Sequence, residues 1–236
     1  MMGSKYREIF AILEKDIEDG CYDETRKLLT EDAYIERFGV SRNTVRRAID
    51  LLIKRGYCFP VQGSGVFLRR KKPPYSIDLE NIYGLTHYMA PLAVTNKIIH
   101  HARIEADAEI AKQLDVPVGS PVLYLERIRY VDGIPYVYEY NYFNLLVLHD
   151  MTYEHLIGSL YTYLEQTGKA PIAFIDTVIH VIRINEKEAE YLKLENGDPG
   201  LEIDCYAMIR SGEVIQWVRD LFHYKNARAL KIATYI

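Results

Sequence analysis

The chain has 236 residues and a formal net charge of −4, and hydrophobic residues make up 49% of it. This composition leaves enough side chain for a substantial core and excludes a disordered chain, and no apolar run is long enough to span a membrane. Cys21, Cys58 and Cys205 are scattered and form no Cys-x-x-Cys pair, which favours reduced thiols over a disulfide or zinc framework. We therefore expect a cytoplasmic protein that holds neither a metal nor another cofactor.

Charge is distributed unevenly along the chain. Residues 37–72 contain ten Lys or Arg and a single acidic residue, Asp50, whereas residues 1–36 carry a net charge of −5 and residues 73–236 one of −8. A net charge of +9 within 36 residues indicates contact with a polyanion. A charged face that only meets water would have the same composition, and it is the alternative.

Two consecutive prolines, Pro73 and Pro74, directly follow four basic residues. Proline interrupts helices and sheets, so this stretch is interpreted as a linker at about residues 69–76. We therefore predict two domains, residues 1–72 and residues 73–236.

Three helices are predicted in the basic N-terminal domain. Apolar residues at helical spacing indicate an amphipathic helix over residues 5–19. Thr30 is placed to cap a short helix that ends at Gly39, and Ser41 is placed to cap a longer helix that runs to about Lys54. Two helices joined by so short a turn indicate a helix-turn-helix.

The helix that follows Ser41 has an apolar arc and an opposite arc rich in arginine. The polar arc consists of Arg42, Asn43, Arg46, Arg47 and Asp50. In a DNA major groove arginine pairs with guanine and asparagine with adenine, so this arc suits the reading of base pairs. The hydroxyl groups of Ser41 and Thr44, with the amide groups at the helix start, suit phosphate contacts. A basic face that only meets water stays the alternative at this point.

A hairpin is predicted after that helix. Residues 57–60 and 66–68 read as short strands around the sequence Gln62-Gly63-Ser64-Gly65. Glycine lets a backbone approach closely, and no longer phosphate-binding pattern accompanies these two glycines. The hairpin is therefore interpreted as a wing beside the arginine-rich helix, within reach of a minor groove.

This pattern closely resembles the winged helix of GntR-type transcriptional regulators. The similarity lies in residues 40–48, in Leu51-Leu52, Gly56 and Gly63-Ser64-Gly65, and in Leu28-Leu29-Thr30-Glu31, where the family has Leu-Pro-Ser-Glu. Asp32 stands where relatives often carry an arginine that touches DNA. The residue pattern and the resemblance together predict DNA contacts by Thr30, Glu31, Ser41, Arg42, Asn43, Thr44, Arg46, Arg47, Gln62, Gly63, Ser64 and Gly65.

The second domain is predicted to contain a diverged internal repeat. In order along the chain, Ala111, Leu114, Val116, Gly119 and Pro121 match Ala189, Leu192, Leu194, Gly197 and Pro199. Strands are predicted over residues 122–131, 135–144, 201–210 and 214–224. Helices are expected from Asp107, from Asn185 with Glu188 as a capping box, and between the two halves over about residues 153–167.

This order of elements predicts an α+β fold with an internally duplicated antiparallel sheet. Crevices beside such a sheet are natural ligand pockets, while a duplication that binds nothing is the alternative. Arg127 and Arg129 share one face of a largely apolar strand, where two guanidinium groups need an anionic partner.

Glu139 on the next strand is the candidate partner of Arg127. A three-residue loop would place Glu139 opposite Arg127, whereas a two-residue turn would place Tyr138 there, and the sequence leaves both open. A structural salt bridge is the alternative to a ligand contact.

From about residue 75 onward the chain resembles the UTRA ligand-binding domain of the HutC branch of these regulators, whose fold is similar to that of chorismate lyase. The similarity lies in Arg127-Ile128-Arg129, in Asp132-Gly133-Ile134-Pro135 and in Glu139, with Gln216 where relatives place a sugar-contacting Glu. The resemblance implies a small anionic effector, a sugar phosphate first, bound by Arg127, Arg129, Glu139, Ser159, Tyr161 and Gln216.

Known catalytic motifs such as His-Glu-x-x-His and Gly-x-Ser-x-Gly are absent from the sequence. A lyase-like enzyme and a DNA-binding protein without an effector are the rival interpretations, and the basic segment favours a regulator. We predict a homodimeric repressor that binds a palindromic operator in double-stranded DNA and leaves it when the effector binds.

Overall fold

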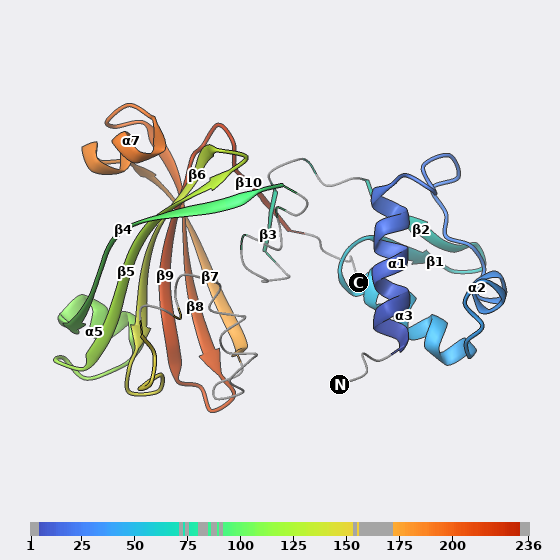
Figure 1. Ribbon diagram of the computed structural model, residues 1–236, viewed down its shortest axis with the longest axis horizontal. Helices are drawn as coiled ribbons and strands as arrows, with labels where there is room; N and C mark the ends of the chain where they lie inside the picture. Colours follow the sequence, from blue (N-terminus) through green and yellow to red (C-terminus); the bar gives the residue numbers. More distant parts are fainter. Residues whose placement is uncertain are drawn as a thin grey trace. The chain divides into compact units, whose positions relative to one another are not determined.

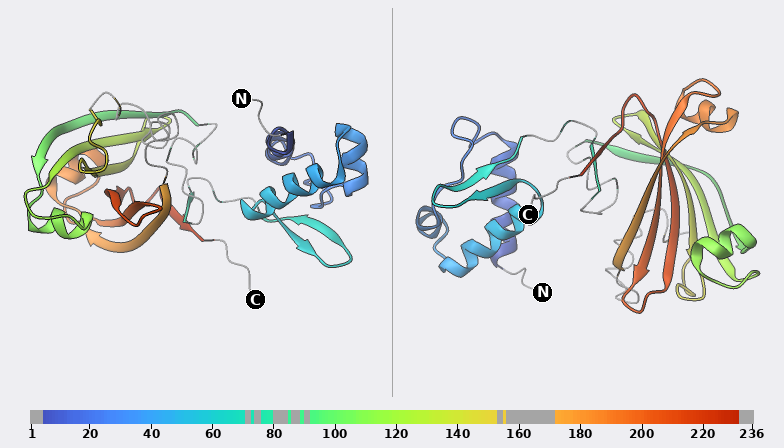
Figure 2. Two further views of the ribbon diagram at one scale, coloured as in Figure 1. Left: turned by 90° about the horizontal axis from the view of Figure 1, so that it is seen from below. Right: turned by 180° about the vertical axis from the view of Figure 1, so that it is seen from behind.

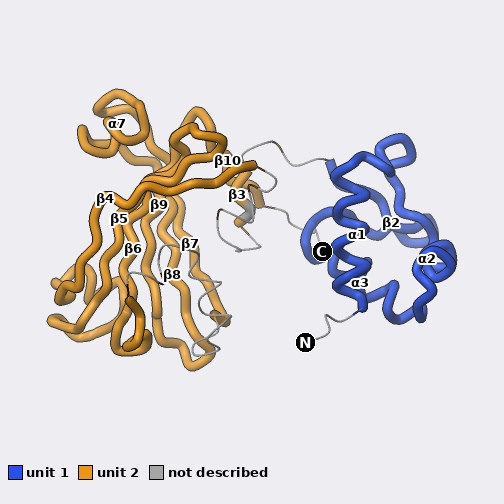
Figure 3. The backbone as a smooth tube through the Cα atoms, in the orientation of Figure 1, with its two compact units in different colours: residues 1–72 blue, residues 73–236 orange. Residues whose placement is uncertain are grey.

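The structure is a computed structural model (Figure 1) that describes residues 5–70, 73, 76–79, 85, 89, 92–152, 155 and 172–231. The chain divides into two compact units, Met1–Lys72 and Pro73–Ile236 (Figure 3). The helix predicted over residues 153–167 lies outside the described residues, apart from residue 155. Within the described ranges, no helix is long and apolar enough to cross a membrane.

Unit 1 is a three-helix domain with a two-stranded hairpin. Its elements are α1 (Lys5–Glu18), α2 (Glu31–Phe38), α3 (Arg42–Lys54), β1 (Cys58–Val61) and β2 (Gly65–Leu68). Apolar side chains from all three helices meet in one core, in which Leu13, Tyr34, Val45, Ala48 and Leu52 are fully buried. β1 and β2 pair antiparallel, and their hairpin extends away from the helices (Figure 2, left).

The helix ends of unit 1 follow from their capping residues. Thr30 and Ser41 are the N-caps of α2 and α3, and each side chain accepts a hydrogen bond from a backbone amide of the first turn. Gly39 ends α2 with φ 62° and ψ 37°, a left-handed conformation that most side chains disfavour. These observations confirm the predicted helix-turn-helix and its hairpin.

Unit 2 is built on a six-stranded antiparallel sheet in the order β4-β5-β6-β9-β8-β7 (Figure 1). Its elements are β3 (Ser76–Asp78), β4 (Val94–Glu105), α5 (Ala108–Leu114), β5 (Pro121–Val131), β6 (Ile134–Asn144), β7 (Ile172–Arg183), α7 (Glu186–Leu192), β8 (Pro199–Ile209), β9 (Val214–Phe222) and β10 (Arg228–Leu230). The short strands β3 and β10 form a separate parallel pair.

The sheet confirms the predicted duplication. β4, α5, β5 and β6 form one half, β7, α7, β8 and β9 form the other, and β6 and β9 adjoin at the centre. Val137 pairs with Phe222 and Phe143 with Gln216, so the halves are related about the central Tyr140–Arg219 pair. Even the helix ends correspond, since Asp115 and Lys193 both close their helix in the left-handed conformation.

The two faces of the sheet are covered differently. α5 and α7 pack on one face, in clusters that contain Ile128, Tyr138 and Trp217. The opposite face carries two other apolar clusters, one around Leu125 and Phe143 and one around Val137, Ile203 and Phe222. Between those clusters, on the central strands, lie the charged side chains that form the second candidate site.

Candidate nucleic-acid interface and effector site

The arginine-rich arc of α3 is presented outward from unit 1. Val45, Ala48 and Leu52 anchor the helix in the core, while Arg42, Asn43 and Arg46 are exposed on its other side. Ser41 and Arg47 are exposed too, and Thr44 is half-buried. The side chains predicted to read bases therefore lie on one accessible surface at the start of the helix.

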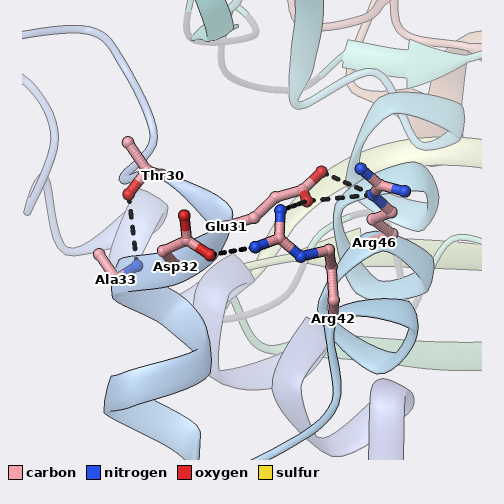
Figure 4. A network of polar contacts seen from close by, with 6 residues as sticks. All are labelled: Thr30, Glu31, Asp32, Ala33, Arg42 and Arg46. Atoms are coloured by element: carbon pink, nitrogen blue, oxygen red, sulfur yellow. Dashed lines mark hydrogen bonds and ion pairs between the residues drawn. The ribbon is translucent and has the colours of Figure 1, made fainter.

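Two of these arginines are held by acidic residues from the first turn of α2 (Figure 4). Arg46 donates from Nε to both carboxylate oxygens of Glu31, at 2.8 and 3.0 Å. Arg42 donates to Glu31 Oε2 at 3.4 Å and, through its other terminal nitrogen, to Asp32. Asp32, at the position where relatives often have arginine, is thus an ion-pair partner of a predicted base-reading residue.

The remaining predicted contacts of unit 1 differ in how they are engaged. Thr30 Oγ1 accepts a hydrogen bond from the amide of Ala33 at 3.3 Å, as an N-cap does. The guanidinium carbon of Arg47 lies 4.2 Å from the ring centre of Tyr6 in α1, a cation–π contact. Arg47 is therefore directed toward α1 and not toward the acids of α2.

The tip of the hairpin is open. Gln62, Gly63, Ser64 and Gly65 are all exposed, and a Cβ added at Gly63 would meet nothing within 4 Å. A Cβ added at Gly65 would lie 2.9 Å from Cε of Lys27, at a φ of 110° that side chains rarely adopt. The tip thus offers backbone groups and the polar side chains of Gln62 and Ser64 to a partner.

In unit 2 the predicted partner of Arg127 is confirmed. Arg127 and Glu139 lie directly opposite each other on β5 and β6, with 2.5 Å between Arg127 Nε and Glu139 Oε2. Arg129 donates to the other oxygen of the same carboxylate at 3.5 Å. The three side chains are only 6–12% exposed, so this is a buried ion-pair cluster.

The pairing of Arg127 with Glu139 depends on an irregularity in the hairpin. Asp132 and Gly133 form a two-residue turn, with φ values of 48° and 78°. Such a turn alone would place Tyr138 opposite Arg127. A β-bulge beside the turn shifts the register by one residue and brings Glu139 there instead.

The structure adds two residues that the sequence analysis missed, Asp220 on β9 and Asn141 on β6. Asp220 lies directly opposite Glu139, and Gln216 donates from Nε2 to Asn141 Oδ1 at 2.9 Å. Asp220 Oδ1 is buried and has no hydrogen-bond partner within the part of the chain that the structure describes. Together with Arg127, Arg129 and Glu139 these side chains form what we call the central polar cluster: Arg127, Arg129, Glu139, Asn141, Gln216 and Asp220.

The pKa values of the two adjacent carboxyl groups, Glu139 and Asp220, shift in opposite directions. Burial opposes the charged form of Glu139, but the guanidinium groups of Arg127 and Arg129 outweigh it and leave the pKa of Glu139 below its usual value. Burial, followed by the neighbouring Glu139 carboxylate, raises the pKa of Asp220 well above its usual value. These shifts favour the ionised form of Glu139, and for Asp220 they favour the protonated form, which can donate a hydrogen bond beside the two guanidinium groups.

Two predicted effector contacts, Ser159 and Tyr161, lie outside the described residues. The other four, Arg127, Arg129, Glu139 and Gln216, come together on one face of the sheet. Apolar clusters on both sides limit access of water to this face, which strengthens polar interactions there.

A winged helix-turn-helix with an exposed arginine-rich helix, joined to a duplicated sheet with a buried polar cluster, defines a two-domain DNA-binding regulator. Residues 5–68 match the family model of bacterial regulatory proteins of the gntR family, and residues 90–228 match the UTRA domain. The chain belongs to the GntR family of transcriptional regulators and carries a UTRA domain. Regulators of this type bind DNA and, through the UTRA domain, small-molecule effectors.

The chain is similar to full-length regulators. It is 29% identical to the HTH-type transcriptional regulator YydK of Bacillus subtilis (strain 168), over 95% of each chain. The crystal structure of YydK superposes with a TM-score of 0.84 at 27% identity and covers 98% of this chain and 99% of that one. It is 30% identical to the regulator YurK of the same organism, covering 92% of this chain and 90% of YurK. It is 26% identical to MngR of Escherichia coli (strain K12), the mannosyl-D-glycerate transport/metabolism system repressor, over 98% of each chain. The family and these relatives are transcriptional regulators, so the chain is not an enzyme.

Proposed function

We propose that this protein is a homodimeric repressor that binds a palindromic operator and is released by a small anionic, hydroxyl-rich metabolite, a sugar phosphate first. The similarity to MngR, a repressor of a mannosyl-D-glycerate system, supports both the sign of the regulation and the class of effector. A two-fold symmetric protein reads two-fold symmetric DNA, which is why we expect a palindrome.

On the DNA side, Arg42, Asn43 and Arg46 at the start of α3 read base edges in the major groove, and the open hairpin tip contacts the adjacent groove. The ion pairs of Arg42 and Arg46 with Glu31 and Asp32 are solvent-exposed, so they are worth little and exchange readily for bases or phosphates. This surface is therefore poised to bind DNA despite its acidic neighbours.

On the effector side, the observation that carries the proposal is the central polar cluster. The guanidinium groups of Arg127 and Arg129, beside a carboxyl group whose protonated form is favoured, suit an anion, while Asp220 Oδ1 offers an unsatisfied hydrogen-bonding atom to a hydroxyl group. A buried polar atom without a partner is costly, so a ligand that satisfies it gains affinity and specificity. An anion that also carries hydroxyl groups matches both features.

Coupling from the effector to the DNA-binding unit has a physical basis within unit 2. Val137 and Phe222 each lie two residues along their strand from Glu139 and Asp220. Both belong to the apolar cluster that contains Ile77 of β3, the first strand after the predicted linker. A ligand at the central polar cluster therefore acts on side chains that pack against the segment leading to the linker.

The test uses the full-length protein, an operator selected by it from random DNA duplexes, and a panel of sugar phosphates and organic acids. We expect one compound class both to raise the melting temperature and to release the operator. Asp220→Ala should abolish that response and keep DNA binding, whereas Arg42→Ala should lose DNA binding and keep the thermal shift. A compound that stabilises the protein without releasing DNA would refute the coupling, and full operator binding by Arg42→Ala would refute the assigned DNA surface.

A further inference from the structure

Lys27, in the segment that leads to α2, lies against the hairpin of unit 1. Its backbone forms an isolated antiparallel bridge with Phe67 of β2. The amide of Leu28 donates to the carbonyl oxygen of Val66 at 2.9 Å. Residues that lie opposite each other in an antiparallel pair direct their side chains to the same face, so the side chains of Lys27 and Phe67 share one face of the hairpin.

The side chain of Lys27 lies beside the tip of the hairpin. Its ammonium nitrogen is 5.5 Å from the ring centre of Phe67, a cation–π contact. A Cβ added at Gly65 would lie 2.9 Å from Lys27 Cε and 3.6 Å from Nζ. Because Gly65 has no side chain, the stem of Lys27 fills this space and its ammonium group is positioned at the tip.

The ammonium group of Lys27 is available to an anion. The residue is exposed, and it forms no ion pair with any acid in the part of the chain that the structure describes. Arg42 and Arg46 differ, because both pair with acids in the first turn of α2. Lys27 is therefore a positioned cation whose charge is not neutralised within the described part of the protein.

Two predicted DNA contacts lie on either side of Lys27. Thr30, the N-cap of α2, follows three residues later, and Gly65 belongs to the hairpin tip. The minor groove of DNA is narrow and is bordered by the phosphates of both strands. A lysine beside a hairpin tip that enters this groove therefore lies within reach of a backbone phosphate.

We infer that Lys27 binds a phosphate of the DNA backbone at the edge of the groove that the hairpin tip contacts. Phosphates are the same at every base pair, so Lys27 contributes affinity and positions the hairpin without discriminating between sequences. The inference rests on the proposed DNA-binding function and adds to it a residue outside the arginine-rich helix and the hairpin tip. A lysine that only stabilises the hairpin through Phe67 is the alternative.

The test compares Lys27→Met with Lys54→Met in the full-length protein. Methionine keeps an unbranched stem that packs on Phe67 and removes the charge. Lys54 is exposed in the last turn of α3, at the end opposite to the predicted base contacts, so the control removes the same charge elsewhere in unit 1.

Fluorescence anisotropy at several salt concentrations measures binding to the selected operator and to DNA of random sequence. One phosphate contact contributes about 0.9 to the slope of log affinity against log salt concentration, so the slope of Lys27→Met should be less steep by about 0.9. At about 0.1 M salt the affinity should fall by about five- to tenfold for both DNAs alike. Lys54→Met should keep the wild-type slope, and so should Lys27→Arg, which retains the charge.

The melting temperature separates a phosphate contact from a structural role. A wild-type slope in Lys27→Met would overturn the inference, and a lowered melting temperature in that variant would then assign Lys27 to hairpin stability. Equal decreases in slope in Lys27→Met and Lys54→Met would also overturn it, because net charge alone would account for both. Full operator binding by Arg42→Ala would instead refute the proposed DNA surface, so the two failures are distinguishable.

Discussion

The two units of this protein use the same ion-pair chemistry in opposite surroundings. In unit 1 the pair of Arg46 and Glu31 has side chains that are 57% and 31% exposed. In unit 2 the pair of Arg127 and Glu139 has side chains that are 12% and 6% exposed. Water and salt screen the first pair, so its arginine exchanges partners at little cost, whereas breaking the second pair leaves a buried charge uncompensated. Exposure, and not the residue types, separates the arginine that we propose to read DNA from the arginine that is held in the central polar cluster.

The largest effect on stability is expected at the buried pair of Arg127 and Glu139. Replacing Glu139 with Gln leaves Arg127 and Arg129 without their shared carboxylate, and we expect unfolding of unit 2 to become about 3–5 kcal/mol easier. The single tryptophan, Trp217, is buried in unit 2, so its fluorescence during urea denaturation reports on this unit. The same substitution at the exposed Glu213 should cost less than about 0.5 kcal/mol. An equal loss in the free energy of unfolding in the two variants would show that burial does not determine how much the ion pair contributes to stability.

A second substitution tests the exposed arginines and should weaken DNA binding while it leaves stability nearly unchanged. Arg42→Ala should weaken binding to the selected operator by about 1–3 kcal/mol, because a base contact is lost. Its free energy of unfolding should change by less than about 1 kcal/mol, since only exposed ion pairs are removed. Fluorescence anisotropy and urea denaturation measure the two quantities, with the exposed Arg210→Ala as the control that alters neither. A large loss of stability in Arg42→Ala would contradict the comparison.

Local features of the fold could be predicted because the residues that define them are close in the chain. Thr30 and Ser41 as N-caps, Gly39 as the left-handed helix end, and the capping box of Asn185 and Glu188 are all confirmed. The duplication was also predictable, because equal spacing of matching residues survives even where the residues themselves diverge.

The composition of the central polar cluster was only partly predictable. Arg127 and Glu139 belong to one hairpin, but Asp220 is brought opposite Glu139 by the pairing of β6 with β9, which sequence spacing does not reveal. A signal was present, since Asp220 interrupts a largely apolar strand as Arg127 does. The bulge that sets the hairpin register lies outside the turn, between Arg129 and Tyr130, so the turn residues do not reveal it.

The pH dependence of stability tests the protonation of Asp220 in the central polar cluster. The pKa of Asp220 is higher in the folded than in the unfolded chain, so its contribution to stability is complete below its ordinary pKa and is lost as pH rises through the raised value. Asp220→Asn does not titrate. Between pH 4 and pH 7, the free energy of unfolding of this variant should therefore rise relative to that of wild type by about 1 kcal/mol or more, since one pKa unit corresponds to about 1.4 kcal/mol.

Urea denaturation at several pH values, read again from Trp217, measures this difference. Asp150→Asn is the control, because the Asp150 side chain is 52% exposed. A constant difference between Asp220→Asn and wild type across this range would show that Asp220 is already ionised when folded.

The smallest expected effect concerns Asp32, the acid that faces Arg42. In Asp32→Asn the carboxylate no longer competes with DNA for Arg42 and no longer repels phosphates, so binding to DNA of random sequence should strengthen by about 0.5–1 kcal/mol. The affinity for the operator should increase less, because there Arg42 is positioned by its base contact. The ratio of specific to non-specific affinity should therefore fall. Glu36→Gln changes the charge of the same helix by the same amount at another exposed position, and anisotropy titrations at two salt concentrations compare the variants. If Glu36→Gln strengthens non-specific binding as much as Asp32→Asn does, net charge accounts for the effect and the contact between Asp32 and Arg42 has no role in discrimination.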